Sequence, residues 1–266
     1  MPALPAVSVA NLRDLGGLPL GPGRSVRPGL VLRSAQLDRL DATEPVVAAL
    51  GIRTVVDFRT DAERAERPDR LPEGARLLVA DVLADRLATS GLPPAARLKE
   101  LLADPALAEE HLGGGRARKA FARTYRTFVS GASARASYRA LLGELGRPGA
   151  GPLLFHCTAG KDRTGWAAVV LLSLLGADEE TVRGEYLAVN TAVRQAFAPM
   201  IEGFIAQGGD PELALELIGV LPEYLDAALD EVAVRHGSME AYVRDGLGVP
   251  DEVTELIRER LTVRAA

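Results

Sequence analysis

The chain has 266 residues, of which 47% are hydrophobic and 25% are charged, and its formal net charge is −5 at pH 7. This composition suits one large domain or two small ones, with a single domain over 1–266 favoured. It excludes disordered, collagen-like and disulfide-scaffold proteins. The excess of acidic side chains argues against a nucleic-acid-binding surface but leaves room for a small cationic pocket.

Short strands, turns and helices are predicted for the first third of the chain. Apolar and β-branched residues indicate buried strands at 30–33, 53–59 and 76–82. A short helix over 43–50 separates the first two strands, and Gly51 ends it.

The rest of the chain is predicted to be mainly helical. Helical periodicity covers 117–129 and 135–146, and a buried strand follows at 153–157. The longest apolar run, 166–177, is too short to span a bilayer and is interpreted as part of a core helix, and an apolar helix is predicted over 163–175. Helices are expected throughout the chain after Asp178. Strands alternating with helices, followed by a helical C-terminal third, predict an α/β sheet domain with helical additions.

The most informative motif is the loop after the strand at 153–157, which reads His-Cys-Thr-Ala-Gly-Lys-Asp-Arg-Thr-Gly over 156–165. Backbone N–H groups of such a loop converge on an anion, and the N-terminus of the next helix adds partial positive charge. Gly160 permits a backbone conformation that other residues resist. Arg163 can direct two N–H donors at one phosphoryl group. The sequence therefore predicts a phosphate-binding loop.

Cys157 is the candidate nucleophile of this loop. An anion-binding environment favours the thiolate, which can attack phosphorus and form a phosphocysteine. Thr164 can donate its hydroxyl to the sulfur and help it leave, while His156 is expected to brace the loop without touching substrate. The predicted substrate-binding residues are Thr158, Ala159, Gly160, Lys161, Asp162 and Arg163.

An inert buried cysteine is the alternative for Cys157, and the residues that surround it in the loop outweigh that alternative. Other loop types fit less well. A Walker A loop needs glycine and Ser/Thr where Phe155 and Asp162 stand. A rhodanese loop is usually shorter, and a zinc site needs more Cys or His than one adjacent pair. Neither a metal nor an organic cofactor is therefore expected.

The loop at 156–165 resembles the signature of cysteine-dependent tyrosine phosphatases, and the chain is similar to the bacterial atypical protein-tyrosine phosphatase family. Shorter family-like blocks follow one another along the chain at 11–17, 32–37, 51–67, 185–190 and 242–248. The resemblance implies a central, mostly parallel sheet of about four or five strands flanked by helices, with a helix-rich C-terminal third. It also implies hydrolysis of phosphotyrosine and, in many members, of phosphoserine, phosphothreonine and phosphoinositides.

Two alternative functions stay open. The first is an enzyme mainly of lipid or inositol phosphates, because Lys161 and Asp162 occupy loop positions where lipid phosphatases carry the same residue types. On this hypothesis the Lys161 ammonium lies at the rim of the pocket. The second is a phosphate-binding pseudophosphatase, which the presence of both Cys157 and Arg163 disfavours.

Two aspartates compete for the role of general acid. Asp81 follows the strand that begins at Arg76, and the carboxyl ends of strands border the ligand crevice in α/β sheets. Asp162 lies in the loop itself, but Arg163 favours its ionised form, which suits a base or a water-orienting group. We therefore favour Asp81 as the acid and Asp162 as an aid to phosphoenzyme hydrolysis. Asp85 is a third candidate.

Structural roles are favoured for several polar and aromatic residues outside the loop. Those near the N-terminus are interpreted as a turn and a salt bridge, the two arginines on strands as paired cations, and the two tyrosines as packing residues. These residues are Asn11, Arg13, Asp14, Arg33, Arg59, Tyr125 and Tyr138.

The stretch 191–221 is a candidate helical lid. Apolar residues of 191–207 fall on one helical stripe, and 212–221 is similarly apolar. Ordinary core packing explains this pattern equally well, but the resemblance implies a mobile helix pair over the active site.

No targeting segment or membrane span is evident, because the stretch 1–9 has neither a basic region nor a long apolar run. The single cysteine excludes an intrachain disulfide. A cytoplasmic location is the default expectation, and secretion without a leader is left open. The expected partner is a phosphoprotein or phosphoinositide substrate.

Overall fold

The computed structural model describes residues 8–85 and 100–264, so most of the stretch 1–9 lies outside the described residues. The central sheet has five strands in the order β1 (Arg13–Asp14), β3 (Val31–Ser34), β6 (Leu153–His156), β4 (Thr54–Asp57) and β5 (Arg76–Val79). β3, β6, β4 and β5 are parallel, and β1 joins the sheet antiparallel. The prediction of a mostly parallel sheet of about four or five strands is therefore confirmed.

The position of β6 at the centre of the sheet decides where the loop 156–165 lies. β6 pairs with β3 on one side and β4 on the other, and Ser34 and Asp57 both stand opposite His156. All residues of these three strands are buried, as expected for parallel strands covered on both faces. The carboxyl ends of the three strands meet at one edge, so the loop after β6 lies between the segments that follow β3 and β4.

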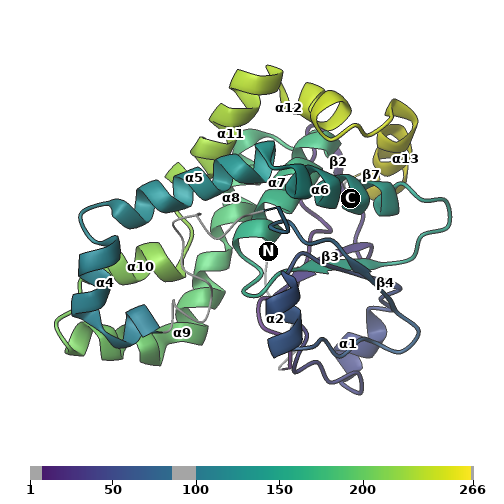
Figure 1. Cartoon of the computed structure of the whole chain (residues 1–266). Helices are drawn as coiled ribbons and strands as arrows, with labels where there is room; N and C mark the ends of the chain where they lie inside the picture. Colours follow the sequence, from purple (N-terminus) through teal and green to yellow (C-terminus); the bar gives the residue numbers. More distant parts are fainter. Residues whose placement is uncertain (1–7, 86–99, 265–266) are drawn as a thin grey trace.

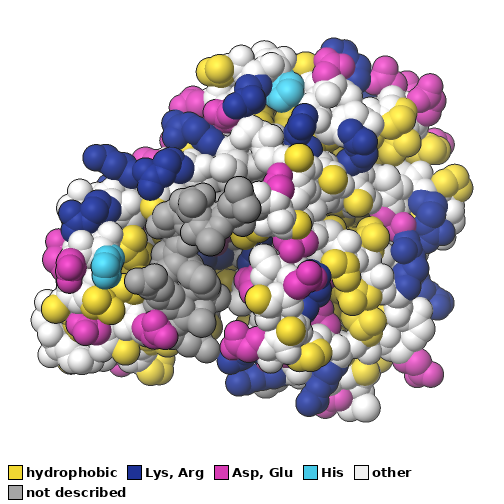
Figure 2. All heavy atoms as spheres, in the orientation of Figure 1, with side chains coloured by type: hydrophobic (Ala, Val, Ile, Leu, Met, Phe, Trp, Pro, Cys, Tyr) yellow, Lys and Arg dark blue, Asp and Glu magenta, His cyan; other side chains and the backbone are white. Residues whose placement is uncertain are grey.

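Helices cover both faces of this sheet (Figure 1). α1 (Pro45–Ala49) packs through Val47 on the smaller apolar cluster, which contains Leu154 of β6. α7 (Asp162–Leu175) lies in the larger cluster, which contains Phe155 of the same strand. Twelve of the 14 residues of α7 are buried, so the prediction of a core helix is confirmed. Within residues 8–85 and 100–264, no helix is long and apolar enough to cross a membrane. On the face of the molecule that Figure 2 shows, acidic and basic side chains are spread among apolar ones.

Most of the predicted helices are confirmed. The predictions at 117–129 and 135–146 correspond to α5 (Arg116–Ser130) and α6 (Ala132–Leu145). α2 (Asp61–Glu66) and α4 (Pro105–Leu112) precede them. The helical C-terminal third comprises α8 (Glu179–Leu187), α9 (Val189–Ala206), α10 (Pro211–Ile218), α11 (Pro222–His236), α12 (Met239–Ala241), the π-helical η1 (Tyr242–Gly246) and α13 (Asp251–Leu261).

The prediction of helix throughout the last third is wrong for its final residues. β7 (Thr262–Arg264) pairs antiparallel with β2 (Arg24–Val26), and Ser25 stands opposite Val263. The partner strand lies near the other end of the chain, so local periodicity could not reveal the pairing. The strand predicted at 76–82 also ends earlier, at Val79 of β5.

α9 and α10 occupy the predicted lid region and lie with α4 away from the sheet (Figure 1). Phe204 of α9 and Leu217 of α10 are fully buried. Arg118 of α5 joins this group through ion pairs of 2.6 Å to Glu212 and 2.5 Å to Glu216. The two helices predicted around 191–221 are therefore present, and both their apolar and their charged side chains contact the rest of the fold.

Candidate active site

The loop 156–165 links β6 to α7 and requires a glycine at its centre. Gly160 has a φ of +66°, in the left-handed region, and a Cβ there would collide with the backbone of Ser34 at the end of β3. The Gly160 carbonyl accepts hydrogen bonds from Asn11 Nδ2 at 2.9 Å and Arg33 Nη2 at 2.8 Å. The loop is therefore held from the side of β3 and of the N-terminal segment.

Glu185 of α8 connects the two arginines on this side of the loop. Its two carboxylate oxygens pair with Arg13 Nη2 at 2.7 Å and Arg33 Nη1 at 2.6 Å, and all three side chains are buried. The structural roles predicted for Asn11, Arg13 and Arg33 are thus confirmed. Glu185 was not singled out as a site residue, although it lies in the family-like block 185–190.

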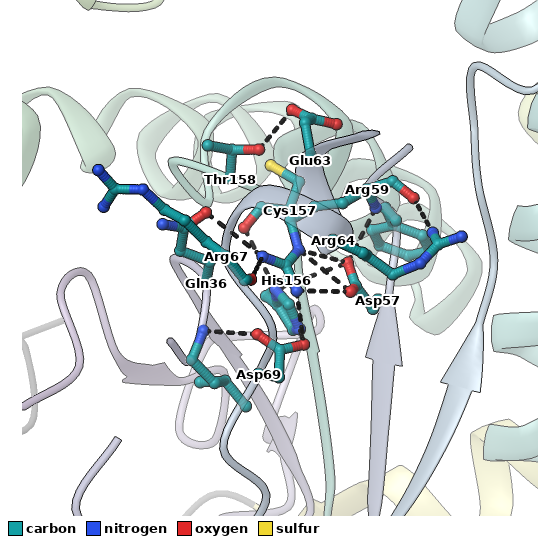
Figure 3. A network of polar contacts seen from close by, with 12 residues as sticks. Gln36, Asp57, Arg59, Glu63, Arg64, Arg67, Asp69, His156, Cys157 and Thr158 are labelled. Carbon is teal, nitrogen blue, oxygen red and sulfur yellow. Dashed lines mark hydrogen bonds and ion pairs between the residues drawn. The ribbon is translucent and has the colours of Figure 1, made fainter. Parts of the chain in front are cut away.

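His156 lies in a buried polar network beside the start of the loop (Figure 3). Its Nε2 lies 3.1 Å from Asp69 Oδ2, and its Nδ1 lies 3.2 Å from the Cys157 carbonyl oxygen. Arg59 pairs at 2.8 Å with both Asp57 and Asp69. Although burial raises the pKa of Asp69, its contacts with His156 and Arg59 hold that pKa below its usual value.

The network pairs Arg59 structurally, as predicted, and neither its side chain nor that of His156 is exposed, which supports the bracing role expected of His156. Asp57, Asp69 and His156 present ligand-type atoms within 4.8 Å of one another, the spacing that a metal ion would need. The Arg59 guanidinium already neutralises both carboxylates at 2.8 Å, so we assign the cluster to loop support.

Arg163 is held by a residue that the sequence reading missed, Glu63 of α2. Arg163 Nη1 lies 2.7 Å from Glu63 Oε2, and Nη2 lies 2.7 Å from Oε1. The hydroxyl of Thr158 donates to the same carboxylate. Burial raises the pKa of Glu63, but the Arg163 charge and these hydrogen bonds outweigh it and hold that pKa far below its usual value.

Glu63 also stabilises the N-terminus of α2, the helix that carries it. It forms a capping box with Thr60, in which the Thr60 side chain accepts the Glu63 N–H and the Glu63 carboxylate accepts the Thr60 N–H at 2.9 Å. The Thr-x-x-Glu spacing of this box is visible in the sequence. It signals a helix start, whereas the contact with Arg163 depends on tertiary structure.

Cys157 lies at the end of the central strand with 2% of its surface exposed. Figure 3 shows its sulfur pointing toward Thr158 and Glu63, the side on which Arg163 is held. The Thr164 hydroxyl is buried and has no hydrogen-bond partner in the part of the chain that the structure describes. The structure thus brings together Cys157, Thr158 and Arg163, and it leaves the Thr164 hydroxyl available to a further acceptor.

Lys161 does not lie at the rim of the pocket, as the lipid-phosphatase hypothesis required. Its ammonium is buried and donates to the carbonyls of Leu217 at 3.1 Å and Gly219 at 2.9 Å. It also lies 5.0 Å above the ring of Phe121. The unpaired carbonyls at the C-terminus of α10 attract a cation, which explains this direction of the side chain.

The candidate acids lie in different environments. Asp81 follows β5, is half-buried and accepts the Leu83 N–H at 2.8 Å. Burial raises the pKa of Asp81, against the opposing effects of that N–H and of the Arg163 charge. Asp85 is exposed and accepts the Ser133 N–H at 2.9 Å. Hydrogen bonds from Ser133 lower the pKa of Asp85, which suits an acid poorly.

Asp162 lies in the first turn of α7 and is bound on both carboxylate oxygens. Oδ1 accepts the hydroxyl of Tyr125 at 3.0 Å, and Oδ2 lies 3.5 Å from the Lys161 ammonium. Tyr125 and Lys161 therefore hold the Asp162 carboxylate by both of its oxygens, one from each side chain.

Sequence comparison with known proteins identifies the family of this chain. A sequence model of the tyrosine phosphatase family matches residues 4–263. A Cupriavidus necator protein named as a candidate tyrosine-protein phosphatase is 32% identical over 252 residues, which cover 91% of this chain and 83% of that protein. The triple specificity protein phosphatase PtpB of Mycobacterium tuberculosis is 34% identical over 258 residues, which cover 88% of this chain and 90% of PtpB. The crystal structure of P. aeruginosa TpbA aligns with a TM-score of 0.30 and 17% identity, over 79% of this chain and 97% of TpbA. The chain belongs to the tyrosine phosphatase family, as the resemblance of its loop implied.

Proposed function

We propose that this enzyme removes phosphate from phosphotyrosine through a covalent phosphocysteine on Cys157. The observation that carries the proposal is the position of Cys157 at the end of β6, beside an Arg163 guanidinium that Glu63 fixes through two contacts of 2.7 Å. A thiol and a fixed, forked cation on one loop are the groups that phosphoryl transfer to sulfur needs. Tyrosine-phosphatase relatives that match most of the chain support the same reaction.

In the first step, the loop N–H groups and Arg163 bind the phosphoryl oxygens, and Thr158, Ala159, Gly160, Lys161 and Asp162 supply the backbone of this cradle. The Cys157 thiolate forms a bond to phosphorus while the bond to the tyrosine oxygen breaks. Asp81 gives its proton to the departing phenolate. The raised pKa of Asp81 favours this role, because an acid must hold its proton until the leaving group departs.

In the second step, water attacks the phosphocysteine. Its oxygen forms a bond to phosphorus, the phosphorus–sulfur bond breaks, and the electron pair returns to Cys157. Asp162, whose carboxylate Tyr125 and Lys161 hold by its two oxygens, accepts a proton from the water. The otherwise unpartnered hydroxyl of Thr164 donates to the returning thiolate.

Phosphoserine, phosphothreonine and phosphoinositides are the wider substrate range within this proposal. PtpB carries triple specificity in its name, which motivates the range. The alternative of a mainly lipid-directed enzyme rests on Lys161 and Asp162 and needs the Lys161 ammonium at the pocket rim, whereas that ammonium donates to two carbonyls. Phosphotyrosine is therefore proposed as the preferred substrate. A cytoplasmic location with phosphoprotein substrates completes this part of the proposal.

A lid over 191–221 in a single domain is a second part of the proposal. Faster amide exchange in α9 and α10 than in the fully packed α7 would support it, because a lid opens more often than a core helix. Equal slow exchange in all three helices would instead assign α9 and α10 to the core.

A substrate panel tests the function directly. Phosphate release from phosphotyrosine, phosphoserine and phosphothreonine peptides and from phosphoinositides is measured with malachite green, and Cys157→Ser serves as the blank. We expect the highest kcat/KM on phosphotyrosine peptides and no release by Cys157→Ser. Turnover that persists in pure Cys157→Ser protein would exclude the phosphocysteine.

A further inference from the structure

Two buried tyrosine hydroxyls form a hydrogen-bonded chain that ends on Asp162. Tyr186 of α8 donates its hydroxyl to that of Tyr125 at 2.9 Å, and Tyr125 of α5 donates to Asp162 Oδ1 at 3.0 Å. The two rings are edge to face, with centroids 6.2 Å apart, and both residues are buried. Three different helices therefore converge on one carboxylate of the catalytic loop.

Packing accounts for the aromatic rings of Tyr125 and Tyr186 but not for their hydroxyl groups. The Tyr125 ring contacts the rings of Phe128 and Tyr224, and phenylalanine would fill that space equally well. A buried hydroxyl is costly unless it is hydrogen-bonded. The two hydroxyls of this chain are bonded to each other and to a loop carboxylate, so the interpretation of Tyr125 as a packing residue is incomplete.

The direction of the chain follows from the protonation of its members. Burial raises the pKa of both Tyr125 and Tyr186 well above the usual value, so both phenols stay protonated and act as donors. The carboxylate at the end of the chain is then the acceptor, with Lys161 3.5 Å from its second oxygen. Each oxygen of Asp162 has its own partner, which fixes the rotation of the carboxylate.

We propose that Tyr125, backed by Tyr186, is a positioning residue that orients Asp162 for hydrolysis of the phosphocysteine. The inference rests on the proposed function. In that step the water oxygen bonds to phosphorus, the phosphorus–sulfur bond breaks with its electron pair passing to sulfur, and Asp162 takes the water proton. Loss of the Tyr125 hydroxyl lets the carboxylate rotate away from the attacking water, while the first step is unaffected.

The two steps separate in steady-state kinetics. A slower second step lowers kcat and KM by the same factor and leaves kcat/KM unchanged, because kcat/KM reports the reaction only as far as the phosphoenzyme. With p-nitrophenyl phosphate, we expect Tyr125→Phe to lower both kcat and KM about 10-fold, a fraction of the ~10²–10⁴-fold that a positioned acid–base group supplies. The burst of p-nitrophenolate should approach one molecule per enzyme.

Three variants make the test specific. Tyr186→Phe keeps the bond from Tyr125 to Asp162 and should give a smaller change in the same direction. In an Asp162→Asn background, Tyr125→Phe should add nothing, since the group that it orients is gone. Tyr242→Phe is the matched control, because it removes a buried hydroxyl that donates to the Phe128 carbonyl at 3.4 Å and should leave all kinetic constants unchanged.

Several outcomes would overturn the inference. A Tyr125→Phe enzyme with wild-type kcat and no larger burst shows that the hydroxyl does not act in the second step. A fall in kcat/KM without a burst shows a structural defect instead, and in that case Tyr186→Phe, the milder change, must show the kcat and KM effect for the inference to survive. Wild-type turnover that does not depend on Cys157 would refute the proposed function itself, a result distinct from either of these.

Discussion

The Arg163 guanidinium and the Glu63 carboxylate face each other through two parallel contacts of 2.7 Å, one for each nitrogen–oxygen pair. This pair joins the catalytic loop to α2, a helix 100 residues earlier in the chain. A bidentate pair restricts the rotation of a guanidinium much more than a single contact does. Glu63 therefore fixes the plane of the Arg163 guanidinium and with it the direction in which this cation faces a phosphoryl group.

We expect Glu63→Gln to lower kcat/KM about 10–100-fold, because a misaligned Arg163 no longer matches the phosphoryl oxygens. The unfolding free energy should fall by about 1–3 kcal/mol, since the Arg163 charge loses its partner in a largely buried place. Glu66→Gln, an exposed residue of the same helix, is the control and should change neither quantity. Wild-type kcat/KM in Glu63→Gln would show that the loop alone orients Arg163.

The same pair makes a pH prediction. The pKa of Glu63 is lower in the folded protein than in the unfolded chain, so its contribution to stability is complete above the ordinary value of 4.5 and is lost as the pH falls below it. Thermal denaturation between pH 3 and 7 should show a steeper acid limb for the wild type than for Glu63→Gln. Acid limbs of equal steepness in the two proteins would contradict a stabilising contribution from the ionised Glu63.

Cys157→Ser and Arg163→Ala separate chemistry from binding. The serine variant should lose turnover yet bind inorganic phosphate much as the wild type does, because backbone N–H groups and Arg163 form most of the cradle. Arg163→Ala should weaken phosphate binding roughly 100-fold, since two charge-assisted hydrogen bonds are lost. Isothermal titration with phosphate measures both. Equal weakening in the two variants would place the sulfur among the main anion contacts.

The chemistry of the loop could be predicted from the sequence because its determinants are local. The buried strand β6 ends at His156, where the loop 156–165 begins, and this loop contains the glycine in the left-handed region and the Arg-Thr helix start. The supports of the loop are not local. Glu63 and Glu185 read in the sequence as ordinary helix carboxylates, and only the tertiary fold brings them against Arg163 and Arg33.

The wrong position for Lys161 has the same origin. Its place in the loop puts its Cα beside the anion site, but the direction of its long side chain is set by carbonyls of Leu217 and Gly219, more than 50 residues away. The hydrogen-bond partner of the Tyr125 hydroxyl could not be predicted for a similar reason. Periodicity predicts which side of a helix is buried, but it does not predict the group with which a buried hydroxyl forms a hydrogen bond.

Lys161→Met should therefore affect the enzyme by loosening the C-terminal end of α10, and not by removing a positive charge that contacts the substrate. The variant keeps the length of the side chain and leaves two carbonyls without their donor, which should cost about 1–3 kcal/mol of unfolding free energy. Phosphotyrosine-peptide and phosphoinositide hydrolysis should fall by similar factors, and amide exchange should rise in α10. Lys119→Met, an exposed change on α5, is the control. A selective loss of phosphoinositide hydrolysis would restore the rim-cation hypothesis.

The division of labour between Asp81 and Asp162 gives the last prediction. An acid that protonates the leaving group matters more as that group becomes more basic, so Asp81→Asn should steepen the dependence of kcat/KM on the leaving-group pKa across a series of aryl phosphates. Activity that needs protonated Asp81 falls as the pH rises through the pKa of this group. Because burial raises that pKa above the usual 3.8, the basic limb of the profile should lie above that value and disappear in Asp81→Asn.

Asp162→Asn should instead keep the wild-type dependence on the leaving group and slow the hydrolysis of the phosphocysteine. If Asp162→Asn steepens the dependence and Asp81→Asn does not, the two roles must be exchanged.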